Sequence, residues 1–142
     1  MKCGDSTVEI EQVNTGGPVE TVFGKIKTLA FPEGSCNCRV TVTALGSVEI
    51  HPDKEVIDDN GILTGTGTRA TITCSGLSCI FGTGGTNLGT LDGSEKDPIV
   101  TANASLKYLV GDASNFTCTL GTGAASWKAE YTVIKPLGLF VI

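Results

Sequence analysis

A strict alternation of apolar and polar residues runs through residues 38–44, which read CRVTVTA. Successive side chains of an extended strand point to opposite faces of a sheet, so Cys38, Val40 and Val42 share one face. Residues 69–74, which read RATITC, repeat the pattern and carry a second cysteine on the apolar face. We therefore predict two half-buried strands whose cysteines both face the core.

Further alternation extends the strand pattern over most of the chain. Residues 102–110 and 126–133 each place an apolar set on one face, and we interpret Trp127 and Tyr131 as core residues rather than as a sugar-stacking platform. No segment has the residue spacing of a helix. Weaker strands are predicted at residues 8–13, 21–30, 47–51, 62–66, 78–81, 87–91, 115–120 and 139–142.

Glycine-rich turn signals separate these strands. Asn60 and Gly61 fit a type I′ hairpin turn, which needs positive φ at both central residues, and this turn would join residues 55–57 to 62–66. Residues 82–85 (GTGG) are read as another turn. Many short strands with turns between them predict an all-β protein, a single-domain antiparallel β-sandwich of about ten to twelve strands. The domain is expected to cover residues 1–142.

The chain has six cysteines but a single histidine, a composition that favours disulfides over zinc binding or redox chemistry. Only Cys74 and Cys79, with four residues between them, fit the outer limit of a zinc-ligand spacing, and a C-x-x-C motif is absent. The facing of the strands predicts two disulfides and leaves the remaining two cysteines to form a third, although Cys36 and Cys38 could exchange partners. The predicted pairs are Cys38–Cys74, Cys79–Cys118 and Cys3–Cys36.

Cysteine content and net charge also indicate the cellular compartment and exclude some classes of partner. Three disulfides indicate an oxidising compartment, so we expect a secreted or cell-surface protein whose signal peptide has been removed, with a lipid-modified Cys3 as the alternative. The net charge of −5 argues against nucleic acid or an anionic membrane as partner. No apolar run approaches the roughly 18–20 residues that a membrane helix needs, so no membrane span is expected.

Three segments form a recognisable pattern: residues 3–7 (CGDST), 71–84 (TITCSGLSCIFGTG) and 126–133 (SWKAEYTV). The Cys-x4-Cys pair and the Trp-x-Ala-x-Tyr strand within them make the pattern specific. It resembles a group of small exported bacterial proteins of uncharacterised role, encoded mainly by soil actinobacteria, in which a signal peptide precedes one Thr- and Gly-rich β domain. The resemblance implies export and a β fold, and it brings no catalytic residues.

Groups suited to catalysis are sparse. His51 is the only histidine and is interpreted as an exposed residue at a strand end, which leaves a Ser or Cys nucleophile without a base. The acidic cluster that follows it is interpreted as a solvated loop, with calcium ligation as the alternative. That cluster contains Asp53, Glu55, Asp58 and Asp59. We therefore expect no catalytic residue, no cofactor and no metal.

These observations predict a non-enzymatic binding or cell-surface module whose partner is an extracellular protein, a glycan or a small ligand. Recognition is expected first in residues 51–60, through His51, Asp53, Glu55, Asp58, Asp59 and Asn60, and second in residues 82–89. The alternatives are a small-ligand carrier with an apolar cleft and, ranked below it, a hydrolase that uses two carboxylates. The apolar segment 137–142 either closes the sheet or pairs with a second chain, which would cause self-association.

Overall fold

The computed structural model of the protein describes residues 3–14, 21–52, 60–93, 99–111, 114–119 and 124–132. These residues form eight strands and one short helix. The strands are β1 (Thr7–Gln12), β2 (Val22–Ala30), β3 (Arg39–Ala44), β4 (Ser47–Pro52), β5 (Asn60–Cys74), β6 (Leu77–Asp92), β7 (Ile99–Gly111) and β8 (Ala124–Thr132), and the helix is α1 (Asn115–Thr119).

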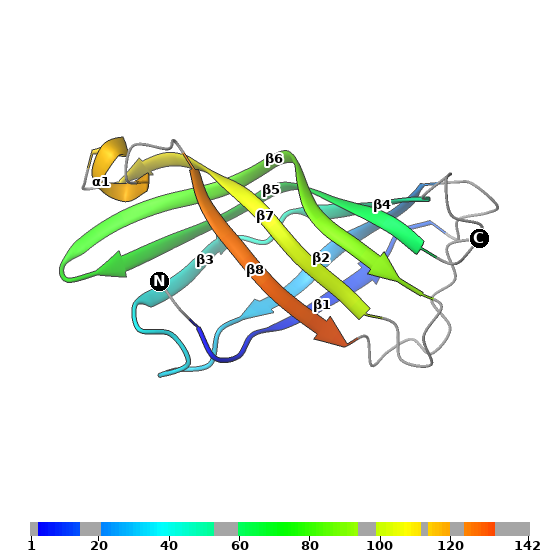
Figure 1. The fold of residues 1–142 in the computed structure, drawn as a ribbon, viewed down its shortest axis with the longest axis horizontal. Helices are drawn as coiled ribbons and strands as arrows, with labels where there is room; N and C mark the ends of the chain where they lie inside the picture. Colours follow the sequence, from blue (N-terminus) through cyan, green and yellow to red (C-terminus); the bar gives the residue numbers. More distant parts are fainter. Residues whose placement is uncertain are drawn as a thin grey trace.

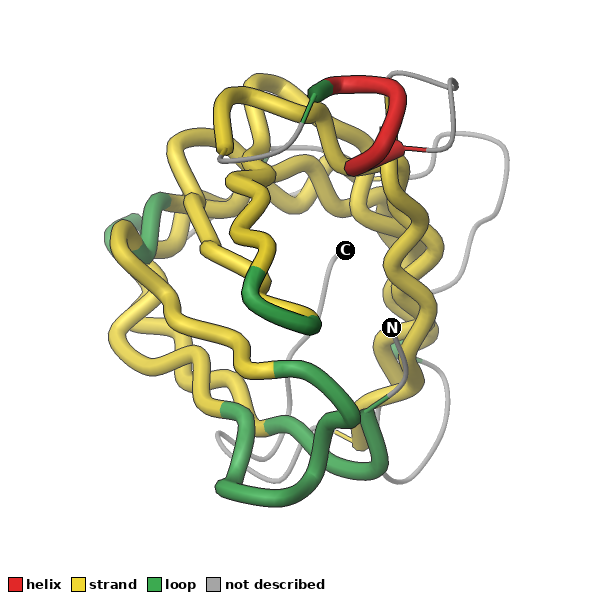
Figure 2. The backbone as a smooth tube through the Cα atoms, turned by 90° about the vertical axis from the view of Figure 1, so that its left-hand side faces the viewer, coloured by secondary structure: helices red, strands yellow, loops and turns green. Residues whose placement is uncertain are grey.

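All eight strands belong to one antiparallel sheet. The strand order is β1-β2-β4-β5-β6-β7-β8, and β3 also pairs with β5, beyond the end of β4. The sheet curls around its own apolar face into a half-barrel (Figures 1 and 2). The all-β antiparallel prediction is confirmed, whereas the β-sandwich is wrong, because one curled sheet covers its own core and needs no second sheet.

The two longest strands explain why the described residues form fewer strands than predicted. Residues 82–85, read as a turn, lie inside β6, and the predicted break after residue 66 lies inside β5. Gly67 and Gly85 have positive φ and absorb irregularities in the ladder without ending either strand. The Asn60–Gly61 turn is also wrong, since both residues are in β5 and neither has positive φ.

The core lies inside the end of the half-barrel that contains β4. Leu91 is 1% exposed and packs in a cluster with Ile26, Val48, Ile50, Leu63, Leu88 and Ala104. Leu88 is the extra residue of an irregularity in the β5–β6 ladder, between the paired residues Asn87 and Gly89, and its side chain lies over Gly65. Trp127 packs against this cluster, as predicted. The rings of Tyr131 and Trp127 meet edge to face, with their centroids 6.3 Å apart.

The segment predicted as a strand at residues 115–120 contains the helix α1 instead. Ser114 caps this helix, because its Oγ accepts a hydrogen bond from the Thr117 N–H at 3.2 Å, and its carbonyl accepts one from the Cys118 N–H at 3.0 Å. These two hydrogen bonds favour a helical turn over an extended strand in this segment. Phe116, the aromatic residue of this segment, is 72% exposed.

Three disulfides are present, and they are the three predicted pairs: Cys3–Cys36, Cys38–Cys74 and Cys79–Cys118. The second pair joins residues at the ends of neighbouring strands, and the third ties α1 to β6. Such a set is typical of a protein from an oxidising compartment. No helix of the described residues is long and apolar enough to cross a membrane.

A hydrogen bond joins the two outer edges of the sheet. The hydroxyl groups of Ser6, just before β1, and Tyr131, on β8, lie 2.6 Å apart. Burial raises the pKa of Tyr131 above its ordinary value of 10.0, and the hydrogen bonds with Ser6 and Trp127 oppose this rise only in part. The neutral phenol is therefore the form that the folded protein favours.

Replacing Tyr131 by phenylalanine should cost about 0.5–1.5 kcal/mol at neutral pH, the usual contribution of one hydrogen bond. A group whose pKa is raised by folding stabilises the fold below its unfolded pKa, and this stability is lost as the pH rises through the folded pKa. Wild-type stability should therefore decline above pH 10.0, while Tyr131→Phe lacks this contribution to the decline. Urea unfolding followed by circular dichroism from pH 7 to 11.5 measures both curves.

Ser6→Ala is the matched control for this titration, because it removes the hydrogen bond and keeps the phenol. It should lose stability at neutral pH and retain the alkaline decline. Parallel pH curves for the wild type and Tyr131→Phe would contradict the assignment.

Candidate functional site

The predicted recognition residues divide into described and undescribed sets. Asp53, Glu55, Asp58 and Asp59 lie outside the described residues, as does segment 137–142. Asn60 is at the start of β5, where its Oδ1 accepts a hydrogen bond from the Gly93 N–H at 3.3 Å. His51 is the member of the predicted set around which a cluster of polar side chains forms.

Residues 82–89, the second predicted recognition loop, are not a loop. They are part of β6, in the stretch where β6 leaves β7. Neighbouring side chains satisfy its backbone N–H groups: Gly85 donates to Thr66 Oγ1 at 3.0 Å, and Gly89 donates to Asn87 Oδ1 at 2.9 Å. These groups hold the irregular strand in place and are not directed toward a ligand.

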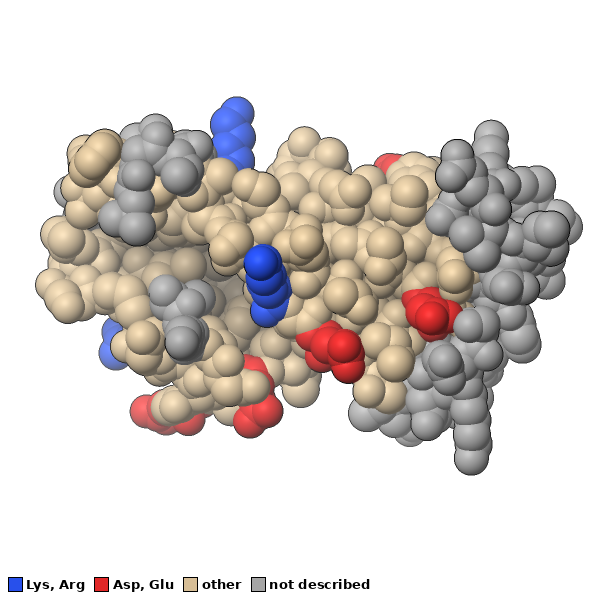
Figure 3. Space-filling view, in the orientation of Figure 1, with Lys and Arg blue, Asp and Glu red and all other residues tan. Residues whose placement is uncertain are grey.

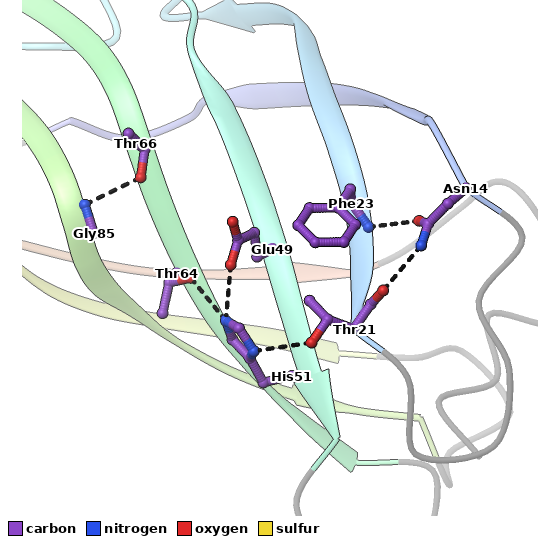
Figure 4. Close-up of polar contacts among 8 residues, drawn as sticks. All are labelled: Asn14, Thr21, Phe23, Glu49, His51, Thr64, Thr66 and Gly85. Atoms are coloured by element: carbon purple, nitrogen blue, oxygen red, sulfur yellow. Dashed lines mark hydrogen bonds and ion pairs between the residues drawn. The ribbon is translucent and has the colours of Figure 1, made fainter.

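His51 lies on the outer face of β4 with polar partners from three strands or their ends (Figure 4). Its Nδ1 is 3.2 Å from Thr21 Oγ1, next to β2, and its Nε2 is 3.2 Å from Thr64 Oγ1 on β5. Glu49 is two residues earlier on β4, so it shares this face, and its Oε2 lies 3.2 Å from the same Nε2. The His51 side chain is 41% exposed.

In a neutral His51 ring, the chemistry of these partners favours one tautomer. A carboxylate only accepts hydrogen bonds, so Glu49 favours the tautomer of His51 that carries its proton on Nε2. Nδ1 then accepts a hydrogen bond from the Thr21 hydroxyl. The cluster thus presents hydroxyl, imidazole and carboxylate groups together at the surface.

An exposed aromatic ring lies beside this cluster. Phe23 on β2 pairs with Glu49 across the ladder and is 45% exposed. Asn14 fixes the backbone around it, since its Oδ1 accepts from the Phe23 N–H at 2.7 Å and its Nδ2 donates to the Thr21 carbonyl at 2.9 Å. Ile62, opposite His51 on β5, is exposed as well. We call Thr21, Phe23, Glu49, His51, Ile62 and Thr64 the outer-face patch.

The order Thr21–His51–Glu49 has the connectivity of a nucleophile, a base and an orienting acid. Three features argue against that use. Thr64 and Glu49 compete for one ring nitrogen, the His51 and Glu49 side chains are 41% and 43% exposed, and the patch lies on the outer face of the curled sheet. Catalysis of this kind needs a site that excludes water and holds donors for the developing oxyanion.

The charged groups elsewhere give no second centre among the described residues. No group of three or more His, Cys, Asp or Glu side chains is placed to hold a metal in the ranges that the structure describes. Glu11 and Lys27 form an exposed ion pair at 2.7 Å, and the hydrogen bond and charge of Lys27 lower the pKa of the Glu11 carboxyl. A general acid needs the opposite shift. The face in Figure 3 carries scattered single charges.

Sequence reasoning found His51 but missed its partners. The alternation in the predicted strand at residues 47–51 already places Glu49 and His51 on one face, so this pair was accessible to period-two reasoning. Thr21, Phe23 and Thr64 join them only through the pairing of β2 and β5 with β4, and no local pattern specifies that register.

The chain matches no protein-family model, and no curated protein or solved structure is significantly similar to it. The fold and the outer-face patch define an all-β antiparallel half-barrel with three disulfides and an exposed cluster of aromatic and polar groups on its convex side. The resemblance to small exported β-domain proteins stays a prediction.

Proposed function

We propose that the protein is an extracellular, non-enzymatic binding module that recognises a glycan through the outer-face patch. The observation that carries this proposal is the exposed ring of Phe23 beside the hydrogen-bonding groups of Glu49, His51 and Thr64. An aromatic face packs against the C–H groups of a sugar ring, while neighbouring donors and acceptors bind its hydroxyl groups.

The shape of the patch favours a glycan over a protein partner. The exposed large apolar side chains of the patch are Phe23 and Ile62. Two such side chains give a smaller apolar area than the centre of a stable protein interface needs. An extended saccharide can lie along three neighbouring strands without a deep pocket. Export, implied by the three disulfides, would bring the patch into contact with such chains.

Native gel electrophoresis in gels containing a soluble, uncharged polysaccharide tests the proposal. The panel is hydroxyethyl cellulose, xyloglucan, glycol chitin and mannan. At least one polymer should retard the wild type, and Phe23→Ala should weaken its affinity for that polymer about fivefold or more, since a stacked ring contributes about 1 kcal/mol or more. Phe116→Ala is the matched control, because it removes an even more exposed ring from α1. Its retardation should equal that of the wild type.

Two outcomes would count against the proposal. Unretarded migration of the wild type with every polymer would reject glycan binding. Equal retardation of Phe23→Ala and the wild type would show that the outer-face patch is not the site.

A further inference from the structure

The end of the half-barrel that contains β3 has an inner face that is apolar but only half buried. Val40, Ile72 and Cys79 lie opposite one another on β3, β5 and β6, and the next inward row contains Val42, Ala70, Phe81 and Tyr108. Directly opposed residues share a face of the sheet. Tyr108 comes two residues after Leu106, which packs against the core, so this shared face is the inner one. Of these seven, Phe81 is buried and the other six remain partly exposed.

The two ends of the half-barrel are filled differently. The end that contains β4 is closed by Leu63, Leu88 and Leu91, each exposed by 9% or less. In the end that contains β3, the inward positions hold smaller side chains such as Val40, Val42 and Ala70, and the first row ends at Gly111. Phe81 and Tyr108 meet edge to face at 6.1 Å and separate the two ends.

A hollow is visible at this end of the molecule. Figure 3 shows the surface recessed on the side of β8 that faces the β5–β6 hairpin. A groove of about 510 Å³ adjoins the same face, because Val40 and the Cys38–Cys74 disulfide are among its lining residues.

We infer that this hollow binds a small, uncharged, largely apolar molecule. The apolar body would lie on Val40, Val42 and Ile72, where half-buried side chains gain contacts that the folded chain alone does not supply. Among the described residues that line the adjoining groove, Glu33 and Arg39 are charged with opposite signs and favour no net charge on the ligand.

This site is separate from the outer-face patch. Val40 and Ile72 face inward at the end that contains β3, whereas Phe23 and His51 face outward at the β2–β4 ladder. The inference therefore does not depend on glycan binding. Phe23→Ala should leave the hollow unchanged, so failure of one proposal is distinguishable from failure of the other.

Titration with Nile red, an uncharged apolar dye whose emission rises in apolar surroundings, tests the inference. The wild type should bind one dye per chain with saturation. Val40→Trp fills the hollow and should weaken binding tenfold or more, whereas Thr41→Trp, one residue later on the outer face, should stay within twofold of the wild type. Ile72→Trp fills the same space from β5 and serves if Val40→Trp fails to fold by circular dichroism.

Several outcomes would overturn the inference. Linear, unsaturable dye uptake would mean general surface adsorption, and equal losses in Val40→Trp and Thr41→Trp would place the dye elsewhere. Saturable binding of the anionic dye anilinonaphthalene sulfonate without binding of Nile red would reject an uncharged ligand.

Discussion

Replacing Gly89 by alanine is expected to destabilise the protein by about 4 kcal/mol, enough to unfold a marginally stable domain. Gly89 is in β6 with φ at 141°, a backbone conformation that side chains rarely adopt, at a cost of about 1–3 kcal/mol. An added Cβ would also overlap the backbone carbonyl of Thr101 on β7. Neither the backbone of Gly89 nor that of Thr101 can move without breaking the β6–β7 ladder. The resulting overpacking adds about 1–3 kcal/mol or more to the cost of the unfavourable φ.

Gly84→Ala is the matched control for this prediction. Gly84 belongs to the same irregular stretch of β6, but its φ is not positive and its added Cβ would meet no atom within 4 Å. Its stability should be unchanged or higher by up to about 1 kcal/mol, because alanine reduces the freedom of the unfolded chain. Urea unfolding measures both variants, and a loss of less than about 1 kcal/mol for Gly89→Ala would contradict the geometry.

The irregular stretch of β6 that contains Gly89 marks the limit of sequence reasoning in this chain. Period-two alternation located the strands that become β3, β4, β7 and β8. The facing of the predicted strands gave two of the disulfides, Cys38–Cys74 and Cys79–Cys118, and the remaining two cysteines gave the third. The Cys79–Cys118 pair is correct although Cys118 lies in α1 and not in a strand. The same rules read Gly82 to Gly85 as a turn, because glycine marks both turns and bulges. Only pairing across 15- and 16-residue strands distinguishes these cases, and that pairing is a property of the whole sheet.

The sheet architecture has the same origin. A sandwich and a curled single sheet share alternation, strand length and turn composition, so the local pattern fits both. Two features separate them in this structure. The irregular stretch of β6 turns Leu88 inward, and the Ser6–Tyr131 hydrogen bond joins residues 125 positions apart in the chain. The register that places Phe23 beside Glu49 is equally non-local, which is why the sequence identified His51 but not the outer-face patch.

Removing the Cys79–Cys118 disulfide by the double substitution Cys79→Ala/Cys118→Ala should cost about 4 kcal/mol. The bridge spans 39 residues, and the loss follows from the freedom that the unfolded chain regains. A local effect should accompany the global one. The helix α1 has five residues, too few to be stable alone, and the disulfide fixes it to β6. Amide exchange at Thr117 and at position 118 should therefore accelerate more than exchange in β5.

The Cys3→Ala/Cys36→Ala variant separates these two effects. Its disulfide spans 33 residues, so loop entropy predicts nearly the same global loss, also about 4 kcal/mol. It does not touch α1, so the Ser114-capped turn should keep its protection relative to β5. Urea unfolding gives the global term and hydrogen exchange the local one. If both variants accelerate exchange in α1 equally, the helix depends on the stability of the whole sheet and the Cys79–Cys118 bridge has no local role. If only the first variant does so, that bridge is what keeps α1 folded against β7 and β8.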